Sequence, residues 1–224
     1  MIQIYRDLVQ GSDEWLTARC GILTASEMNR IITPTLKVAR NEKASAHLFE
    51  LLAQRITNYV EPHYISDDML RGQVDEIEAR LLYAKHYAPV EEVGFITNDE
   101  WGFTIGYSPD GLVGDAGLIE CKSRRQKFQA ETIIAGEMPD DFAIQVQTGL
   151  LVSGRQWCDF VSYCGGMPMA TIRVHADDVI QDAIIEAATD FELRMSKMLE
   201  RYQTALTDGR LIPTERRIEQ EMFI

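Results

Sequence analysis

Residues 108–122 read Ser-Pro-Asp-Gly-Leu-Val-Gly-Asp-Ala-Gly-Leu-Ile-Glu-Cys-Lys, so that Asp110 stands ten residues before Glu120. We expect a short strand to end near Asp110, and the glycines between Gly111 and Gly117 would allow a close turn. The chain would then return as a second strand from Leu118 to Lys122. Such a hairpin brings an aspartate, a glutamate and a lysine to one place.

These three side chains suit metal-assisted phosphodiester chemistry. Alternate side chains of a strand share a face, so Glu120 and Lys122 should point one way and Cys121 the other. Asp110, Glu120 and a nearby backbone carbonyl would supply the oxygen ligands that Mg²⁺ prefers. A bound metal lowers the pKa of a water, which a lysine can orient or deprotonate. The pattern is typical of a metal-dependent nuclease.

The same residues also have an ordinary structural interpretation. Aspartate after proline is common in turns, and Glu-x-Lys is common on exposed strands. Leu118 and Ile119, however, keep the second strand apolar up to the acid, which a solvated hairpin would not need. We therefore favour the nuclease interpretation.

Length and composition indicate one folded domain. The chain has 224 residues, of which 46% are hydrophobic and 25% charged, enough to bury a core. We expect residues 1–224 to form a single domain. The first residues lack a secretion signal, and no stretch reaches the roughly 18 apolar residues of a membrane span. A cytosolic protein is therefore expected.

The cysteines and histidines show no metal-ligand spacing. The four cysteines lack a C-x-x-C pair, and the four histidines lack H-E-x-x-H or H-x₃-H spacing. This pattern disfavours a zinc site, an iron–sulfur cluster and a disulfide framework. The residues concerned are Cys20, Cys121, Cys158, Cys164, His47, His63, His86 and His175.

The formal net charge of −13 is unusual for a nucleic-acid enzyme, which normally shows a basic face. A small positive cleft can nevertheless coexist with an acidic surface. The densest basic run is Lys122 to Lys127, directly after the candidate metal site, although a solvated loop would have the same composition. Candidates for a basic cleft are Arg19, Arg71, Arg80, Lys122, Arg124, Arg125 and Lys127.

Hydrophobic periodicity predicts a mixed α/β fold with one central mixed sheet flanked by helices. Ser12 and Thr24 to Glu27 are expected to open the first two helices. Val74, Ile77 and Leu81 recur at helical spacing, which indicates an amphipathic helix. The predicted helices span 13–19, 24–32, 42–59, 67–87, 140–152 and 177–207, the last ending near Gly209. The predicted strands span 91–97, 102–107, 117–122, 157–163 and 170–174.

Four blocks in this order resemble the phage lambda exonuclease family, also called YqaJ-type viral recombinases. They are Gly11 to Glu27, Arg71-Gly72 with Glu76 and Ala79-Arg80, the 108–122 stretch, and Gln145-Val-Gln147. The resemblance runs nearly the whole chain. It implies a restriction-endonuclease-like core and a Mg²⁺-dependent nuclease that digests one strand of duplex DNA 5′-to-3′ from an end.

The resemblance also implies roles for individual residues. Asp110 and Glu120 would bind metal with the backbone carbonyl of Cys121, Lys122 would act on the attacking water, and Glu76 would lie near a second ion. Mg²⁺ is expected, with Mn²⁺ as an alternative and two ions per active site. A pocket for the 5′-terminal phosphate would be formed by Arg19, Ser26, Ser108 and Gln145. An apolar wedge that parts the strands would be Met69 or Leu70.

At the level of assembly, the resemblance implies a ring-shaped homotrimer that threads DNA and digests it processively. A ring can keep acidic surfaces outside while basic residues line the channel, which would fit the net charge. A single-strand annealing protein is the implied partner, which would load onto the 3′ overhang. The protein would belong to a phage or prophage and act in the cytoplasm of a bacterial host.

Three other interpretations remain open. A related endonuclease, junction resolvase or Cas4-like nuclease would share Asp110, Glu120 and Lys122, although a Cas4-like protein carries iron–sulfur cysteines that this chain lacks. A non-enzymatic acidic DNA mimic or binding module would explain the net charge but not the clustered motifs. A glycosidase built on Glu91 and Glu92 is disfavoured, since adjacent strand residues face opposite sides.

Overall fold

Two mixed four-stranded sheets form the centre of the protein in the computed structural model, which describes residues 1–62, 66–207 and 210–216. The first sheet has the order β1-β3-β4-β2, with only β4 and β2 parallel. The second has the order β5-β6-β7-β8, with only β6 and β7 parallel. The strands are β1 (Ile2–Tyr5), β2 (Leu23–Thr24), β3 (Phe95–Asn98), β4 (Ile105–Tyr107), β5 (Gly111–Val113), β6 (Gly117–Ser123), β7 (Trp157–Tyr163) and β8 (Ala170–His175).

The mixed α/β class is confirmed, but the prediction of one sheet is wrong. The chain leaves the first sheet after Tyr107 and enters the second at Gly111. Pro109 lies between the two strands and has no N–H to extend a ladder, which accounts for the break. Part of the expected turn after Asp110 is strand β5, which pairs with β6.

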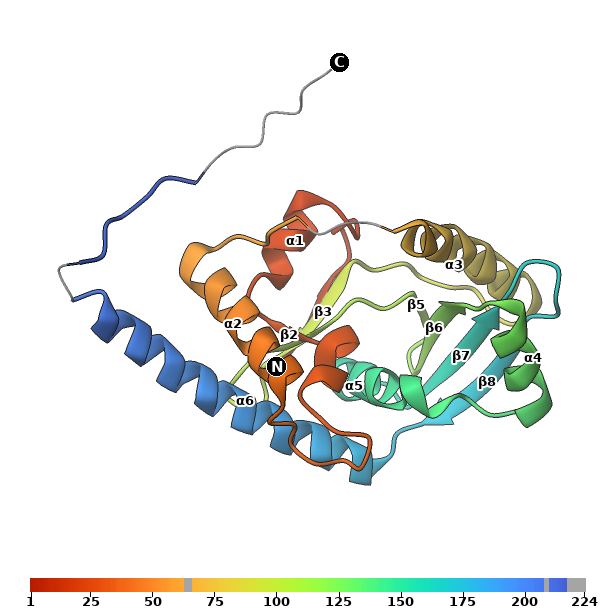
Figure 1. The fold of residues 1–224 in the computed structure, drawn as a ribbon. Helices are drawn as coiled ribbons and strands as arrows, with labels where there is room; N and C mark the ends of the chain where they lie inside the picture. Colours follow the sequence, from red (N-terminus) through yellow and green to blue (C-terminus); the bar gives the residue numbers. More distant parts are fainter. Residues whose placement is uncertain (63–65, 208–209, 217–224) are drawn as a thin grey trace, which may run out of the picture.

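The helices largely follow the predicted spans (Figure 1). Ser12, Asn41 and Ser66 each cap a helix by accepting a hydrogen bond from a backbone N–H. The helices are α1 (Asp13–Arg19), the 3₁₀ turn η1 (Ala25–Arg30), α2 (Glu42–Thr57), α3 (Asp67–His86), α4 (Gln126–Ala135), the 3₁₀ turn η2 (Asp140–Phe142), α5 (Ala143–Ser153) and α6 (Asp178–Ala205). Gly209, expected near the end of the last helix, lies outside the described residues.

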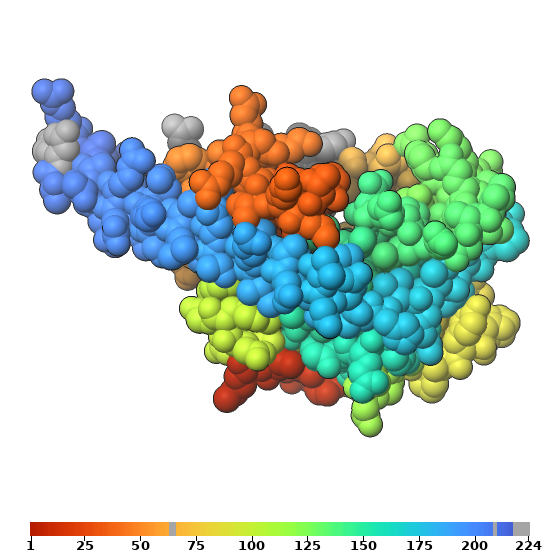
Figure 2. Space-filling model, turned by 90° about the horizontal axis from the view of Figure 1, so that it is seen from below, coloured from red at the N-terminus to blue at the C-terminus, as the bar shows by residue number. Residues whose placement is uncertain are grey.

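Helix α5 is the most buried helix and lies in the main core. Its residues Val146, Leu150 and Val152 are buried, and the helix packs against η1, α6 and strands of both sheets. Helix α6 crosses one face of the molecule, where Figure 2 shows it running past the body at its Ala205 end. No helix in the described ranges is both long and apolar enough to cross a membrane.

Helix α3 has its polarity reversed relative to an ordinary amphipathic helix. Val74, Ile77 and Leu81 are 61%, 50% and 61% exposed, whereas Ala79 and Tyr83 are buried against the second sheet. The Tyr83 hydroxyl donates to Asp159 Oδ2 on β7 at 2.6 Å, and Arg173 also binds this carboxylate. The inward face of α3 is therefore partly polar.

Candidate active site

The β5–β6 hairpin sets Asp110 beside Glu120. Gly111 pairs with Ile119 in antiparallel register, which places Asp110, just before β5, opposite Glu120. The Cys121 N–H donates to Asp110 Oδ2 at 2.5 Å, and both carboxylates are buried. N–H and C=O of one strand residue point to the same edge. The Cys121 carbonyl therefore points toward the strand edge where Asp110 lies. This is the direction it needs in order to bind the same metal ion as Asp110.

Three donors from three elements hold the carboxylate of Glu120, which is 1% exposed. Lys122 Nζ on β6 donates to Oε1 at 2.7 Å, Gln145 Nε2 on α5 donates to the same oxygen at 2.5 Å, and the Tyr107 hydroxyl at the end of β4 donates to Oε2 at 2.9 Å. The predicted alternation holds, since Glu120 and Lys122 share a face of β6. A buried carboxylate held from three sides is fixed in one orientation.

The electrostatics of this cluster favour a cation. Burial raises the pKa of Asp110 well above its ordinary value, and the negative charges of Glu120 and Glu76 raise it further. Burial alone would lower the pKa of Lys122, but the charges of Glu120 and Asp110 outweigh it, so the net shift is upward. Lys122 is therefore an ammonium at neutral pH. Carboxylate oxygens and one carbonyl form the hard donor set that suits Mg²⁺ or Mn²⁺.

Glu76 reaches the same cluster from α3. Arg80, one turn later, donates to Glu76 Oε1 at 3.1 Å and to the Asp110 carbonyl at 3.3 Å. Its other nitrogen pairs with Glu92 at 2.9 Å. Burial raises the pKa of Glu76; Arg80 opposes that shift and Glu120 adds to it. Arg80 thus ties α3 to the start of β5.

Three of the four residues of the predicted phosphate pocket are linked to one another through Trp15 and Thr24. The Trp15 indole N–H donates to Ser108 Oγ at 3.0 Å, and its ring lies 4.3 Å under the Arg19 guanidinium. Arg19 also donates to Thr24 Oγ1 at 3.2 Å, and the Ser26 hydroxyl lies 3.4 Å from the same oxygen. Among the described residues Gln145 has no hydrogen bond to this group and donates instead to Glu120 at 2.5 Å.

Arg19 has the environment of an anion-binding arginine. Burial lowers its pKa, an effect that Glu27 opposes, but arginine starts so high that the guanidinium stays charged. In the described part of the chain Arg19 forms no ion pair with a carboxylate. An arginine fork without such a partner is suited to bidentate phosphate binding.

The candidate wedge residues Met69 and Leu70 lie on the first turns of α3 and are 44% and 49% exposed. Core packing, the ordinary explanation for two apolar side chains, does not apply to them. They are therefore free to contact a ligand.

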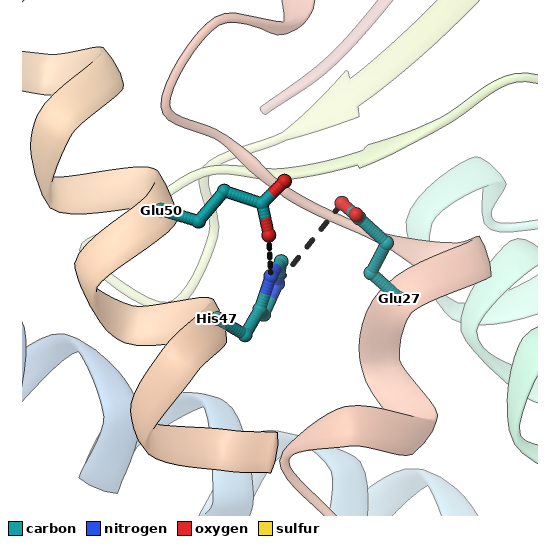
Figure 3. A group of neighbouring side chains, drawn as sticks. All are labelled: Glu27, His47 and Glu50. Carbon is teal, nitrogen blue, oxygen red and sulfur yellow. Dashed lines mark hydrogen bonds and ion pairs between the residues drawn. The ribbon is translucent and has the colours of Figure 1, made fainter. Parts of the chain in front are cut away.

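A second acidic group lies away from this centre, on η1 and α2 (Figure 3). The His47 Nδ1 atom is 3.2 Å from Glu50, and its buried Nε2 atom is 4.0 Å from Glu27. Arg30 lies 3.1 Å from Glu50 and 3.7 Å from Glu27. Since Arg30 already supplies a positive charge, we interpret the group as an ion-pair network. Glu27 also accepts a hydrogen bond from Thr24 at 3.0 Å, and Thr24 in turn accepts one from Arg19, so the network is linked to the Arg19 pocket.

Several supporting residues had no assigned role at the sequence level. Trp15 lies inside the quoted Gly11 to Glu27 block and Tyr107 directly precedes the 108–122 stretch, yet only the fold shows that they bind Ser108 and Glu120. Thr24 likewise contacts Arg19, and Arg80, proposed from the sequence only for a basic cleft, contacts Glu76. A polar or aromatic residue next to each motif was the available signal, and it is too common to be specific.

Several solved structures that resemble this chain are exonucleases. The crystal structure of an alkaline exonuclease (LHK-Exo) from Laribacter hongkongensis has 32% identity and a TM-score of 0.77, and the match covers 88% of this chain and 98% of that one. The structure of the same exonuclease in complex with dAMP has a TM-score of 0.78, at the same identity and coverage. A phage related exonuclease from Haemophilus somnus 129PT, at 14% identity and TM-score 0.54 over 79% of this chain and 96% of that one, shares the fold.

Comparison with the curated proteins gave no match. At the family level, residues 14–156 match the YqaJ-like viral recombinase domain. These residues include all of α1 except Asp13, and also Glu76, the Asp110–Lys122 hairpin and Gln145. The match spans more than half of the chain, and with the alkaline exonuclease at 32% identity it shows that the protein belongs to the YqaJ-like viral recombinase family.

Proposed function

We propose that the protein is a metal-dependent 5′-to-3′ exonuclease that digests one strand of linear duplex DNA from a 5′-phosphorylated end. The observation that carries the proposal is the buried Asp110–Glu120 pair with Lys122 bound to Glu120 at 2.7 Å. The family and the alkaline exonuclease at 32% identity support an exonuclease. The dAMP in the complex of that exonuclease suggests that the product is a nucleoside 5′-monophosphate.

Asp110, Glu120 and the Cys121 carbonyl would hold Mg²⁺, or Mn²⁺, and Glu76 would serve a second ion. The metal would supply Lewis-acid activation of the phosphodiester and of an attacking water. Lys122 would orient that water with its ammonium. Gln145 and Tyr107 would fix Glu120 so that the ligand set is formed before DNA binds.

The end specificity would come from the Arg19 pocket. Arg19 and the Ser26 and Ser108 hydroxyls would bind the 5′-terminal phosphate together with Gln145, which also donates to Glu120. Met69 or Leu70 would separate the terminal base pair, at a cost of a few kcal/mol of unstacking. The remaining 3′ overhang would be the substrate for strand-annealing recombination in a bacterial cytoplasm. A single-strand annealing protein would bind it there, and a homotrimeric ring would retain the duplex.

The test uses linear duplex DNA with Mg²⁺, with one 5′ end phosphorylated and the other carrying a hydroxyl. We expect loss of the phosphorylated strand, an intact closed circle, and no digestion by Lys122→Ala or in EDTA. The exposed Lys197 on α6 gives a matched control, since Lys197→Ala should digest as the wild type does.

Two results would reject the proposal in different ways. A nicked or linearised circle would identify an endonuclease with the same catalytic residues. Failure to cleave any DNA, in a protein that is folded, would favour an acidic binding module.

A further inference from the structure

An open cavity of about 580 Å³ is lined by residues from the start of α3, the start of α4 and the turn after β7. Four basic side chains line it, and it contains one carboxylate, Asp75. This concentration of positive charge contrasts with the −13 of the whole chain. The cations are Arg71, Arg124, Arg125 and Lys127.

The arginines of this cavity already converge on an anion. Asp68 accepts from Arg71 at 2.9 Å and from Arg125 at 2.9 Å, although its side chain is 58% exposed. Two arginine forks that meet on one carboxylate can meet on one phosphate oxygen pair in the same way. An external anion would therefore compete with the Asp68 carboxylate for Arg71 and Arg125.

The start of α4 adds further donors. Arg125 occupies the N-cap position without a side-chain hydrogen bond to the helix, and the first turn has no acidic residue. Free N–H groups and the helix dipole favour an anion there. The Nε atom of Arg124 is buried and has no hydrogen-bond partner among the described residues.

The cavity adjoins the catalytic centre through Phe142. The ring centre of Phe142 lies 5.8 Å from Lys122 Nζ and 5.1 Å from the Arg124 guanidinium carbon. Arg19 lies at the end of α1, and Figure 1 shows α1 and α4 on opposite sides of β5 and β6. In this view the β5–β6 hairpin, which carries the candidate catalytic residues, lies between the elements that carry the two basic sites.

We propose that this cavity binds a backbone phosphate of the digested strand on the 3′ side of the cleaved bond. The inference rests on the proposed function. A strand whose terminal phosphate binds Arg19, and whose next linkage lies at Asp110 and Glu120, must continue past Lys122 toward Arg124 and Arg125. Contacts of this kind position the nucleic acid without reading its sequence.

The first test measures binding in EDTA, so that cleavage is not required. Fluorescent duplex with a 5′-phosphate is titrated with the wild type, with Arg125→Gln/Lys127→Gln, and with the control Lys197→Gln/Arg201→Gln on α6. Both pairs are exposed, so all three proteins should melt together. We expect about tenfold weaker binding for the cavity variant alone, and a salt dependence smaller by about two ion equivalents.

The second test identifies the strand. Single neutral methylphosphonate linkages are placed along the digested strand or its complement. At one position in the digested strand, the neutral linkage should weaken binding by the wild type and the control, but not by the cavity variant. Equal affinity and salt dependence of the cavity and control variants would refute the site, and the same pattern in the complement would refute the strand assignment. If the cavity variant binds DNA weakly but the wild type cleaves no DNA, the proposed nuclease activity would be rejected and the phosphate site would stand.

Discussion

At the scale of single residues, the carboxylates of Asp110, Glu120 and Glu76 repel one another, and a bound metal cation would relieve this repulsion. The folded-state pKa of Asp110 is raised by burial and by Glu120 and Glu76, so its neutral form favours the folded state. This contribution is complete below the pKa of the unfolded chain and is lost as the pH rises through the higher folded pKa. At pH 8 in EDTA, well above the pKa of the unfolded chain, the burial of Asp110 without a cation therefore destabilises the protein.

We accordingly expect Asp110→Asn to stabilise the metal-free protein at pH 8 by about 1 kcal/mol or more, while abolishing digestion. The amide oxygen can still accept from the Cys121 N–H. Thermal unfolding in EDTA measures the effect, which should shrink as the pH falls toward 4. Asp182→Asn, on the exposed side of α6, is the control and should change neither property. A lower melting temperature for Asp110→Asn would contradict the electrostatic account.

Arg19 should distinguish phosphorylated from unphosphorylated ends. Arg19 stacks on Trp15 and has no ion pair with a carboxylate among the described residues, which leaves its guanidinium available for a phosphate. We expect Arg19→Ala to lower kcat/KM on 5′-phosphorylated duplex by about 10- to 100-fold, a loss typical of charge-assisted hydrogen bonds. The activity of Arg19→Ala on 5′-hydroxyl ends should equal that of the wild type. The control variant Arg201→Ala should keep wild-type activity on both substrates. An equal loss on both ends would place Arg19 outside the phosphate pocket.

At the scale of elements, α3 shows how a functional helix departs from ordinary patterning. Its inner face must carry Glu76 and Arg80 to the catalytic centre, so the apolar residues Val74, Ile77 and Leu81 are left outside. Periodicity detects that such a helix exists and where its faces divide. It cannot tell which face is inside, because that depends on the hairpin against which the helix packs.

This orientation can be tested by stability. Leu81→Gln should cost less than about 0.5 kcal/mol, as is usual at the surface, because Leu81 is exposed. Tyr83→Phe should cost about 1–2 kcal/mol, because it removes the buried hydrogen bond to Asp159. Chemical denaturation of the two variants measures both values. If Leu81→Gln were the more damaging change, the helix would face the other way.

The hairpin at 108–122 was the most predictable element. The alternation of Glu120 and Cys121 and the meeting of Asp110 with Glu120 follow from strand geometry alone. Strand β1 and helix α4 were not predicted. Strand β1 is short and half-polar, and α4 begins inside a basic run without a capping side chain, so neither has a strong local signal.

At the scale of the whole molecule, a ring remains a prediction that would reconcile the net charge of −13 with DNA binding. We expect light scattering to give the mass of three chains, 3 × 25.4 = 76.2 kDa. Digestion begun on labelled duplex should continue for many nucleotides after excess unlabelled DNA is added. A mass of one chain, or a halt after a few nucleotides, would contradict enclosure of the duplex.

The overall arrangement of two sheets could not be read from the sequence, because strand periodicity does not say which sheet a strand joins.

The most direct test of the central claim is the order in which labels leave a duplex. Linear DNA carries one label on the 5′-terminal nucleotide and another on the 3′-terminal nucleotide of the same phosphorylated strand. For 5′-to-3′ digestion we expect the 5′ label to appear first, as a mononucleotide, and the 3′ label to follow only after a delay that grows with duplex length. Early release of the 3′ label, or of short oligonucleotides, would contradict it.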